Sequence, residues 1–215
     1  RFSILWNSAF LPSQHQGVYL NHSKIEPKEM IPWLRNNQLS PEAQRKQLDL
    51  MHALNRDHLA TQNAPDRALQ GRIKAMETAY RMQFEATDAF DISKEPENVR
   101  EAYGKGHFAN GCLLARRLSE RGVRFIQVYY GNGQPWDTHN KHNETTPKLA
   151  QSIDQPIAAL LNDLKLRGML EDTLIIWGGE FGRTPVSENG TGRDHNPHGF
   201  MMWMAGGGVR GGMSL

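Results

Sequence analysis

The pattern that most constrains the fold is a strand, a helix and a second strand in direct succession. Residues 123–130 and 173–178 are rich in β-branched and aromatic side chains, a composition typical of strands. Between them, Thr146 and Pro147 begin a long apolar helix that Gly168 ends. Two strands joined by a crossover helix lie parallel in one sheet. The sequence therefore predicts an α/β fold, in which helices flank a mainly parallel sheet.

The first part of the chain carries helical rather than strand patterns. Residues 1–38 have proline and glycine at loop spacing and predict an irregular segment. Ser40 and Pro41 have the character of an N-cap and a first helical residue, and the helix they begin continues to about Thr61. After a break, a second helix with an apolar face follows. We expect the two helices to form an antiparallel hairpin.

A further helix is expected from Phe108 to Arg121, ended by Gly122. Its apolar residues predict the buried face and its charged residues the exposed one. The expected inward residues are Cys112, Leu114, Ala115 and Leu118, and the expected outward residues are Arg116, Arg117, Glu120 and Arg121. We expect an irregular segment with a helical hairpin over residues 1–104 and the α/β part over residues 105–215, within one structural domain. The run at 200–205 predicts a third strand of that part.

Charge and hydropathy exclude several classes of partner. The net charge is +2 with both signs interspersed, so no basic stripe for nucleic acid or a membrane surface is present. No apolar run reaches the length of a transmembrane helix, and no signal peptide is visible. Because the chain opens on Arg1 without methionine, we expect it to be a portion of a longer protein. The one cysteine, Cys112, is expected to be a buried thiol without a chemical role.

Two histidine-rich segments lie on either side of the second strand. The first is Trp136–His139, with His142 close behind, and the second is Arg193–Gly199. Each contains an aspartate, and Glu180 follows the strand between them. Imidazole and carboxylate groups together suit divalent transition metals. Because open α/β folds bind ligands at the carboxyl ends of their strands, the sequence predicts that these groups converge on one metal site.

The predicted ligands are Asp137, His139, Glu180, His195 and His198, and each has an ordinary alternative. The triplet at Asp137 and His139 is also typical of a turn with a capping aspartate. For His198 a solvated loop position is an equal alternative. Asp194 is expected to orient an imidazole while His195 binds the ion.

Arg183 is the predicted catalytic residue outside the ligand set. Its guanidinium could clamp a phosphate or sulfate oxyanion in a bidentate manner. The alternative is a local ion pair with Glu180 that holds the loop. The glycine-rich run at 206–212 lacks the lysine and hydroxyl residue of a phosphate-binding loop and predicts a tight turn.

A series of segments along the chain resembles the DUF1501 family, an uncharacterised group placed in the alkaline phosphatase and sulfatase superfamily. The segments that carry the resemblance are Phe10–Ser13, Gln16–Gly17, Tyr80–Gln83, Ser93–Pro96, Leu114–Leu118, Arg121–Phe125, Trp136–His139, Gly179–Pro185, Gly192–His195 and Ala205–Val209. The resemblance implies an alkaline-phosphatase-like sheet, a longer protein and export to the periplasm or cell surface. It also implies that Asp137 and His139 are ligands of one metal and that His195 is a late histidine ligand.

The resemblance also has departures. Glu180 and Phe181 stand where the superfamily has aspartate and histidine, so one nitrogen ligand is missing. The nucleophile and its companion aspartate lie near the N-terminus in that superfamily and are not expected in this chain. Cys112 lacks the sequence context of a sulfatase nucleophile.

Three functions remain open from the sequence. The first is the C-terminal portion of a hydrolase of small phosphate or sulfate esters that depends on a divalent metal, with Zn as the first choice and Mn, Mg or Ca as alternatives. The second is a non-catalytic binding or surface-associated protein that keeps the fold. The third is an assembly module in which the histidine-rich segments are structural. Neither the substrate nor the oligomeric state follows from the sequence.

Overall fold

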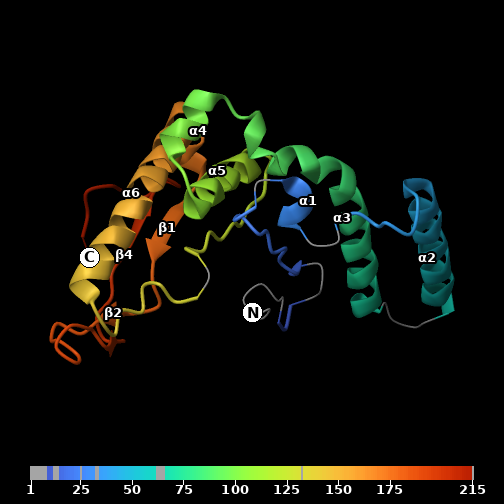
Figure 1. The fold of residues 1–215 in the computed structure, drawn as a ribbon. Helices are drawn as coiled ribbons and strands as arrows, with labels where there is room; N and C mark the ends of the chain where they lie inside the picture. The colour runs from blue at the N-terminus through green and yellow to red at the C-terminus, as the bar shows by residue number, and fades with distance from the viewer. Residues whose placement is uncertain are drawn as a thin grey trace. The chain divides into compact units, whose positions relative to one another are not determined.

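The computed structural model describes residues 9–11, 15–24, 26–31, 34–61, 66–131 and 133–214, and it divides into two compact units, residues 1–91 and 92–215. The first unit contains the helices α1 (Pro27–Met30), α2 (Pro41–Thr61) and α3 (Arg67–Phe90). The second contains the short 3₁₀ helices η3 (Ile92–Lys94) and η4 (Leu170–Asp172) and the helices α4 (Glu97–Tyr103), α5 (His107–Glu120) and α6 (His142–Leu166). Its strands are β1 (Ile175–Gly178), β2 (Gly182–Arg183), β3 (His195–Asn196) and β4 (Met202–Ala205) (Figure 1).

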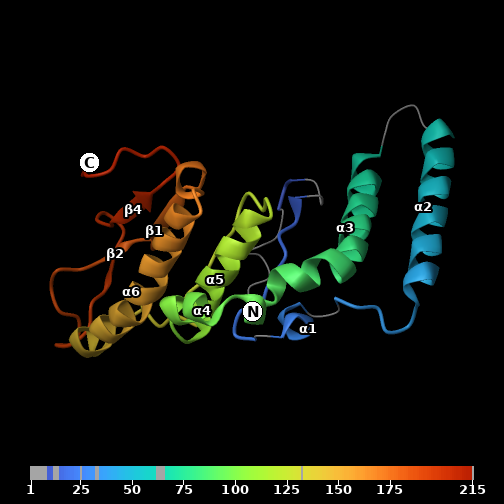
Figure 2. The same ribbon diagram turned by 90° about the horizontal axis from the view of Figure 1, so that it is seen from above.

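The helical hairpin expected in the first unit is confirmed. Helix α2 begins at Pro41, and the Ser40 hydroxyl accepts a hydrogen bond from the amide of Ala43 at 3.2 Å, as an N-cap residue does. Helices α2 and α3 run side by side (Figure 2). A bidentate ion pair of Arg45 with Glu77, at 3.0 and 2.7 Å, joins them.

Helix α5 lies within one residue of its expected bounds, and Glu120 and Arg121 are exposed as expected, but the expected exposure of Arg116 and Arg117 is wrong. The Arg116 side chain is fully buried and pairs with Glu95 at 2.5 Å, Glu120 at 2.7 Å and Asp163 at 2.9 Å. Arg117 is also buried and pairs with Glu95. Helical spacing alone does not reveal that these arginines point inward, because their partners Glu95 and Asp163 lie outside α5. Glu95 directly follows η3 and Asp163 lies in α6, so the ion pairs join α5 to these two elements.

The expected mainly parallel sheet flanked by helices is wrong. The described residues form two small antiparallel sheets of two strands each, and about half of the chain is helical. β1 pairs with β4, with Ile175 opposite Ala205 and Gly178 opposite Met202, while β2 pairs with β3. The second and third predicted strands therefore exist, but they are neighbours that run in opposite directions. The helix between residues 130 and 173 is not a crossover between paired strands.

The predicted strand at 123–130 is also absent from the described structure. The amide of Val123 bonds to the Leu118 carbonyl, but residues 124–130 make no backbone hydrogen bond with any described residue. Their side chains nevertheless alternate between exposed and half-buried from Phe125 to Tyr130, which is the period of a strand. The composition thus indicated the alternating burial that a strand has, whereas a strand also needs a partner that the described residues do not supply.

No helix among the described residues is long and apolar enough to cross a membrane, as the sequence led us to expect. Helix α6 begins at His142, earlier than the expected start at Thr146, and Pro147 and Pro156 lie within it. The earlier start brings the N-terminal end of α6 directly to the first histidine-rich segment.

Candidate metal centre

The two histidine-rich segments are joined along their backbones. The amide of Arg193 donates to the Thr138 carbonyl at 3.0 Å, and the amide of His142 donates to the Thr191 carbonyl at 2.9 Å. Gly192 allows this close approach, because a Cβ atom at that position would lie 1.8 Å from the carbonyl oxygen of His139. Glycine is therefore required where the segments meet, and the contact places their side chains in one cluster.

The Asp137 carboxylate is at the centre of this cluster. Its Oδ1 atom lies 2.7 Å from Nη1 of Arg183, 3.0 Å from Nε2 of His195 and 3.1 Å from Nε2 of His139. The hydrogen bonds from His195 and Arg183 lower the pKa of Asp137 to about 2. Asp137 is consequently ionised at any physiological pH and is available as an anionic ligand.

The His139 ring is held from both sides. Its Nδ1 lies 2.6 Å from Oε2 of Glu188, while its Nε2 lies near Asp137 and 3.3 Å from Nε2 of His195. The hydrogen bond to Glu188 is the main cause that raises the pKa of His139 above its ordinary value. Histidines that bind metals in proteins use the same arrangement, in which a carboxylate fixes one ring nitrogen and leaves the other for the ion.

Strands β2 and β3 place the remaining side chains of the cluster. Arg183 and His195 are opposite one another in this short ladder. The Phe181 ring packs against the His195 ring with centroids 4.3 Å apart, and the Arg183 guanidinium lies 5.6 Å from the Phe181 centroid. Phe181 therefore packs directly against an imidazole of the cluster and an arginine beside it.

Among the described residues, two overlapping groups of side chains have the geometry to hold an ion. In the first, ligand atoms of Asp137, His139 and His195 all lie within 4.8 Å of one another, and in the second those of His139, Glu188 and Asp194 do. His139 belongs to both groups, and because its Nδ1 contacts Glu188 at 2.6 Å, its Nε2 is the nitrogen left open toward the first group. One carboxylate and two imidazoles form the three-ligand set of catalytic zinc sites, which leave a further position open.

The remaining predicted site residues lie outside this group. Glu180 is exposed and is a member of neither group, and the same is true of His198. The alternative considered for Arg183, a local pair with Glu180, is not formed, since Arg183 pairs with Asp137. The Asp194 carboxylate accepts a hydrogen bond from the backbone amide of His195 at 2.7 Å, and it belongs to the group with His139 rather than to the one with His195.

Glu188 is the residue that sequence reasoning missed. It precedes Asn189 and Gly190, a pair typical of a tight turn, and the amides of Thr191 and Gly192 both donate to its carbonyl. This turn directs the chain back toward His139. A carboxylate just ahead of a turn that leads into a histidine-rich segment was the available signal.

A family model described as "Protein of unknown function (DUF1501)" matches residues 3–215. No curated protein and no solved structure gives a significant match. The matching description names no reaction.

Proposed function

The chain belongs to the DUF1501 family, and we propose that it contributes a divalent-metal site to the hydrolysis of small phosphate or sulfate esters. The observation that carries the proposal is the convergence of Asp137, His139 and His195. These residues are separated by up to 58 positions, yet their ligand atoms lie within hydrogen-bond distance of one another. The mixed nitrogen and oxygen set suits zinc first and manganese next, and it suits magnesium or calcium less well.

The chemistry of the cluster supports a hydrolytic role. A divalent ion at such a site polarises an ester oxygen or lowers the pKa of a bound water. Asp137 would supply negative charge to the ion, while Glu188 would keep Nε2 of His139 directed toward it. Arg183 has guanidinium nitrogens beyond the one that contacts Asp137, and these can bind an oxyanion beside the ion.

A second part of the proposal concerns the place of these residues in a longer protein. Because no nucleophile is identified in the cluster, we propose that these residues are the C-terminal portion of a longer, exported member of the alkaline phosphatase and sulfatase superfamily. The nucleophile would then come from the preceding polypeptide. The resemblance of the motif segments supports this view.

The test is metal binding by the whole natural protein. Isothermal titration with Zn²⁺ on the metal-stripped protein should give one site that is lost in Asp137→Ala and His195→Ala. His198→Ala is the matched control, because this histidine is exposed and outside both groups. Equal zinc affinity in all four proteins would eliminate the site.

Hydrolysis is tested separately on the metal-loaded protein with aryl phosphate and aryl sulfate esters. A second candidate function is a non-catalytic binding protein. It is favoured by Phe181, which packs on His195 and stands where the superfamily that the chain resembles has a histidine ligand. Zinc binding without turnover of any ester in the panel would support this second function, and turnover that depends on Asp137 would exclude it.

A further inference from the structure

We propose that the apolar cavity between residues 123–130 and β1 is the seat of one additional β-strand, supplied by polypeptide of the same protein outside these 215 residues. The proposal depends on the proposed function only in assigning the strand to a longer form of this protein. Its evidence is the cavity itself and the two backbone edges that border it.

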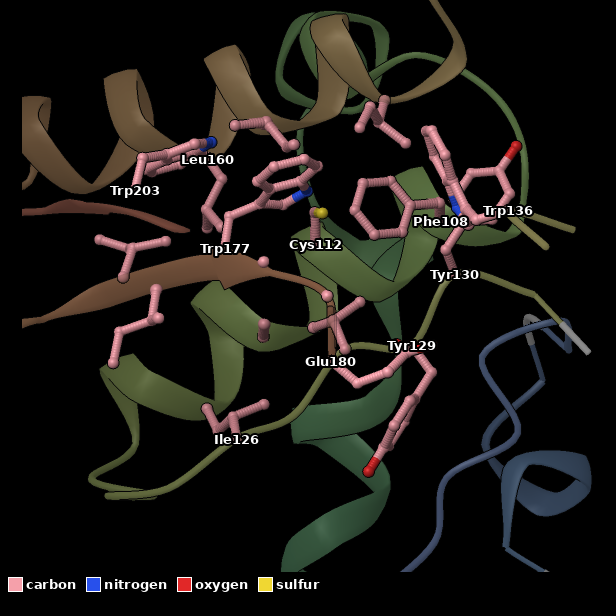
Figure 3. A pocket seen from close by; sticks show the side chains of 18 of the residues that line it. Phe108, Cys112, Ile126, Tyr129, Tyr130, Trp136, Leu160, Trp177, Glu180 and Trp203 are labelled. Atoms are coloured by element: carbon pink, nitrogen blue, oxygen red, sulfur yellow. The ribbon is translucent and has the colours of Figure 1, made fainter. Parts of the chain in front are cut away.

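The cavity has a volume of about 990 Å³ and lies wholly within residues 92–215. Its lining is mainly aliphatic and aromatic. Side chains of α5 such as Phe108 and Cys112 face it, as do Leu160 of α6 and Trp177 of β1 (Figure 3). Cys112 is buried in the core of this unit. The cavity is thus continuous with a hydrophobic core rather than being a shallow surface groove.

One border of the cavity is formed by residues 123–130, whose side chains alternate in burial as those of a strand do. Val123, Ile126, Val128 and Tyr130 line the cavity, and the backbone of residues 124–130 bonds to no described residue. Backbone amides and carbonyls are obligatory hydrogen-bonding groups. An extended segment that contributes apolar side chains to a core but leaves its backbone unpaired has the character of a strand without its neighbour.

The opposite border is a free edge of β1. Among the described residues β1 pairs only with β4, so its other edge has no strand beside it. Residues 173–178 line the cavity, and within this run Leu174 and Ile176 remain 48% and 52% exposed. An exposed apolar strand edge is a template for pairing with another segment.

A strand is the occupant that satisfies both borders at once. It offers a row of donors and acceptors along each edge, which a helix does not, since a helix satisfies its own backbone. Its side chains toward α5 and α6 would be aliphatic, matching Leu160 and Phe108. A transient partner would leave this core open to water whenever it dissociated. We therefore assign the strand to the same polypeptide, where its association is permanent.

The position of the cavity gives the additional strand a further role. The lining of the cavity continues to Asp137, Arg183 and His195, so one end of the strand reaches the metal cluster. The cluster offers one carboxylate and two imidazoles, and a residue at that end of the strand is positioned to complete it or to act beside it.

Hydrogen–deuterium exchange on the whole natural protein tests the proposal. Amides of residues 124–130 should exchange at least 100-fold more slowly than in an unstructured peptide, and an apolar segment outside these residues should be protected with them. Val128→Lys places a charge in the cavity and should lower the protection of both segments from exchange. Val186→Lys is the matched control, because Val186 is 70% exposed and outside the cavity.

Several results would overturn the proposal. These are free exchange at residues 124–130 in the wild-type protein, protection that vanishes on dilution and so comes from a second copy, and a natural protein with no polypeptide beyond these residues. If Val128→Lys does not fold, the wild-type exchange still decides. Zn²⁺ titration of the same sample separates the two proposals. Protection of residues 124–130 without zinc binding would contradict only the proposed function. Zinc binding without protection of these residues would contradict only the additional strand.

Discussion

Glu188 and His139 meet at 2.6 Å, although 49 positions of sequence separate them. The contact uses Nδ1 of the ring, so that Nε2 is left facing Asp137 and His195. Two loops that share no regular element therefore define the tautomer and orientation of one imidazole.

Glu188→Gln should weaken zinc binding about 10- to 100-fold, because carboxylates that orient a metal-binding histidine contribute that much to affinity. It should also lower the pKa of His139, since the hydrogen bond to Glu188 is the main cause that raises it. Titration calorimetry measures the first effect and NMR titration of the imidazole signals the second. Ser187→Ala is the adjacent control, and an unchanged His139 pKa in Glu188→Gln would contradict the assignment.

Zinc affinity should fall as the pH falls through the raised pKa of His139, because the protonated ring cannot bind an ion. Asp137 is not the cause, since its pKa is about 2. In the metal-free protein, the contribution of His139 to stability changes with pH in the opposite direction. A folded-state pKa above the unfolded one adds stability that is full below the unfolded pKa and is lost as the pH rises through the folded pKa. Zinc titrations between pH 5 and 8, which span about the usual range of histidine, measure the first trend; a flat profile refutes it.

Arg183→Ala should lower kcat/KM for phosphate esters by about 10- to 100-fold, the usual effect of losing a hydrogen bond to a charged group. Inorganic phosphate should inhibit the variant less than the wild type. Arg183→Lys keeps the charge but not the planar fork, so it should restore only part of the activity. Steady-state kinetics with zinc bound check this prediction. Full activity in Arg183→Ala would show that the arginine only pairs with Asp137.

Gly192→Ala should destabilise the protein by about 1–3 kcal/mol, as insertions into packed positions do. The added Cβ would lie 1.8 Å from the His139 carbonyl oxygen, so the two loops must separate. Thermal unfolding measures the change, and zinc binding should weaken in parallel. Gly211→Ala is the matched control, since a Cβ there meets nothing within 4 Å. Equal melting temperatures for the two variants would mean that the loops do not meet as described.

Arg116→Ala should cost about 3 kcal/mol or more, because it leaves the buried Glu95 and the half-buried Asp163 with one cation fewer. Arg124→Ala, at an exposed position, should change stability by less than about 0.5 kcal/mol. Urea unfolding of the two variants gives the comparison. A similar midpoint for both would show that the buried ion pairs contribute nothing net.

Local signals in the sequence predicted local structure well. Ser40 and Pro41 marked the start of α2, and Gly122 marked the end of α5, because capping depends on a few adjacent residues. The spacing of Asp137, His139 and His195 also pointed to residues that the fold brings together. Features that depend on distant partners were not accessible. Arg116 is turned inward by carboxylates from other elements, and the run at 123–130 has strand composition but no strand to pair with among the described residues.

Cys112 has a practical consequence for chemistry on this protein. Burial raises the pKa of its thiol to about 12, so almost no thiolate exists at neutral pH, and thiolate is the form that reacts with alkylating reagents and oxidants. It is also the single cysteine of the chain. A spectroscopic label can therefore be attached through a cysteine engineered on the surface without first removing Cys112. Any later reactivity of the native thiol would then report that α5 has separated from its neighbours.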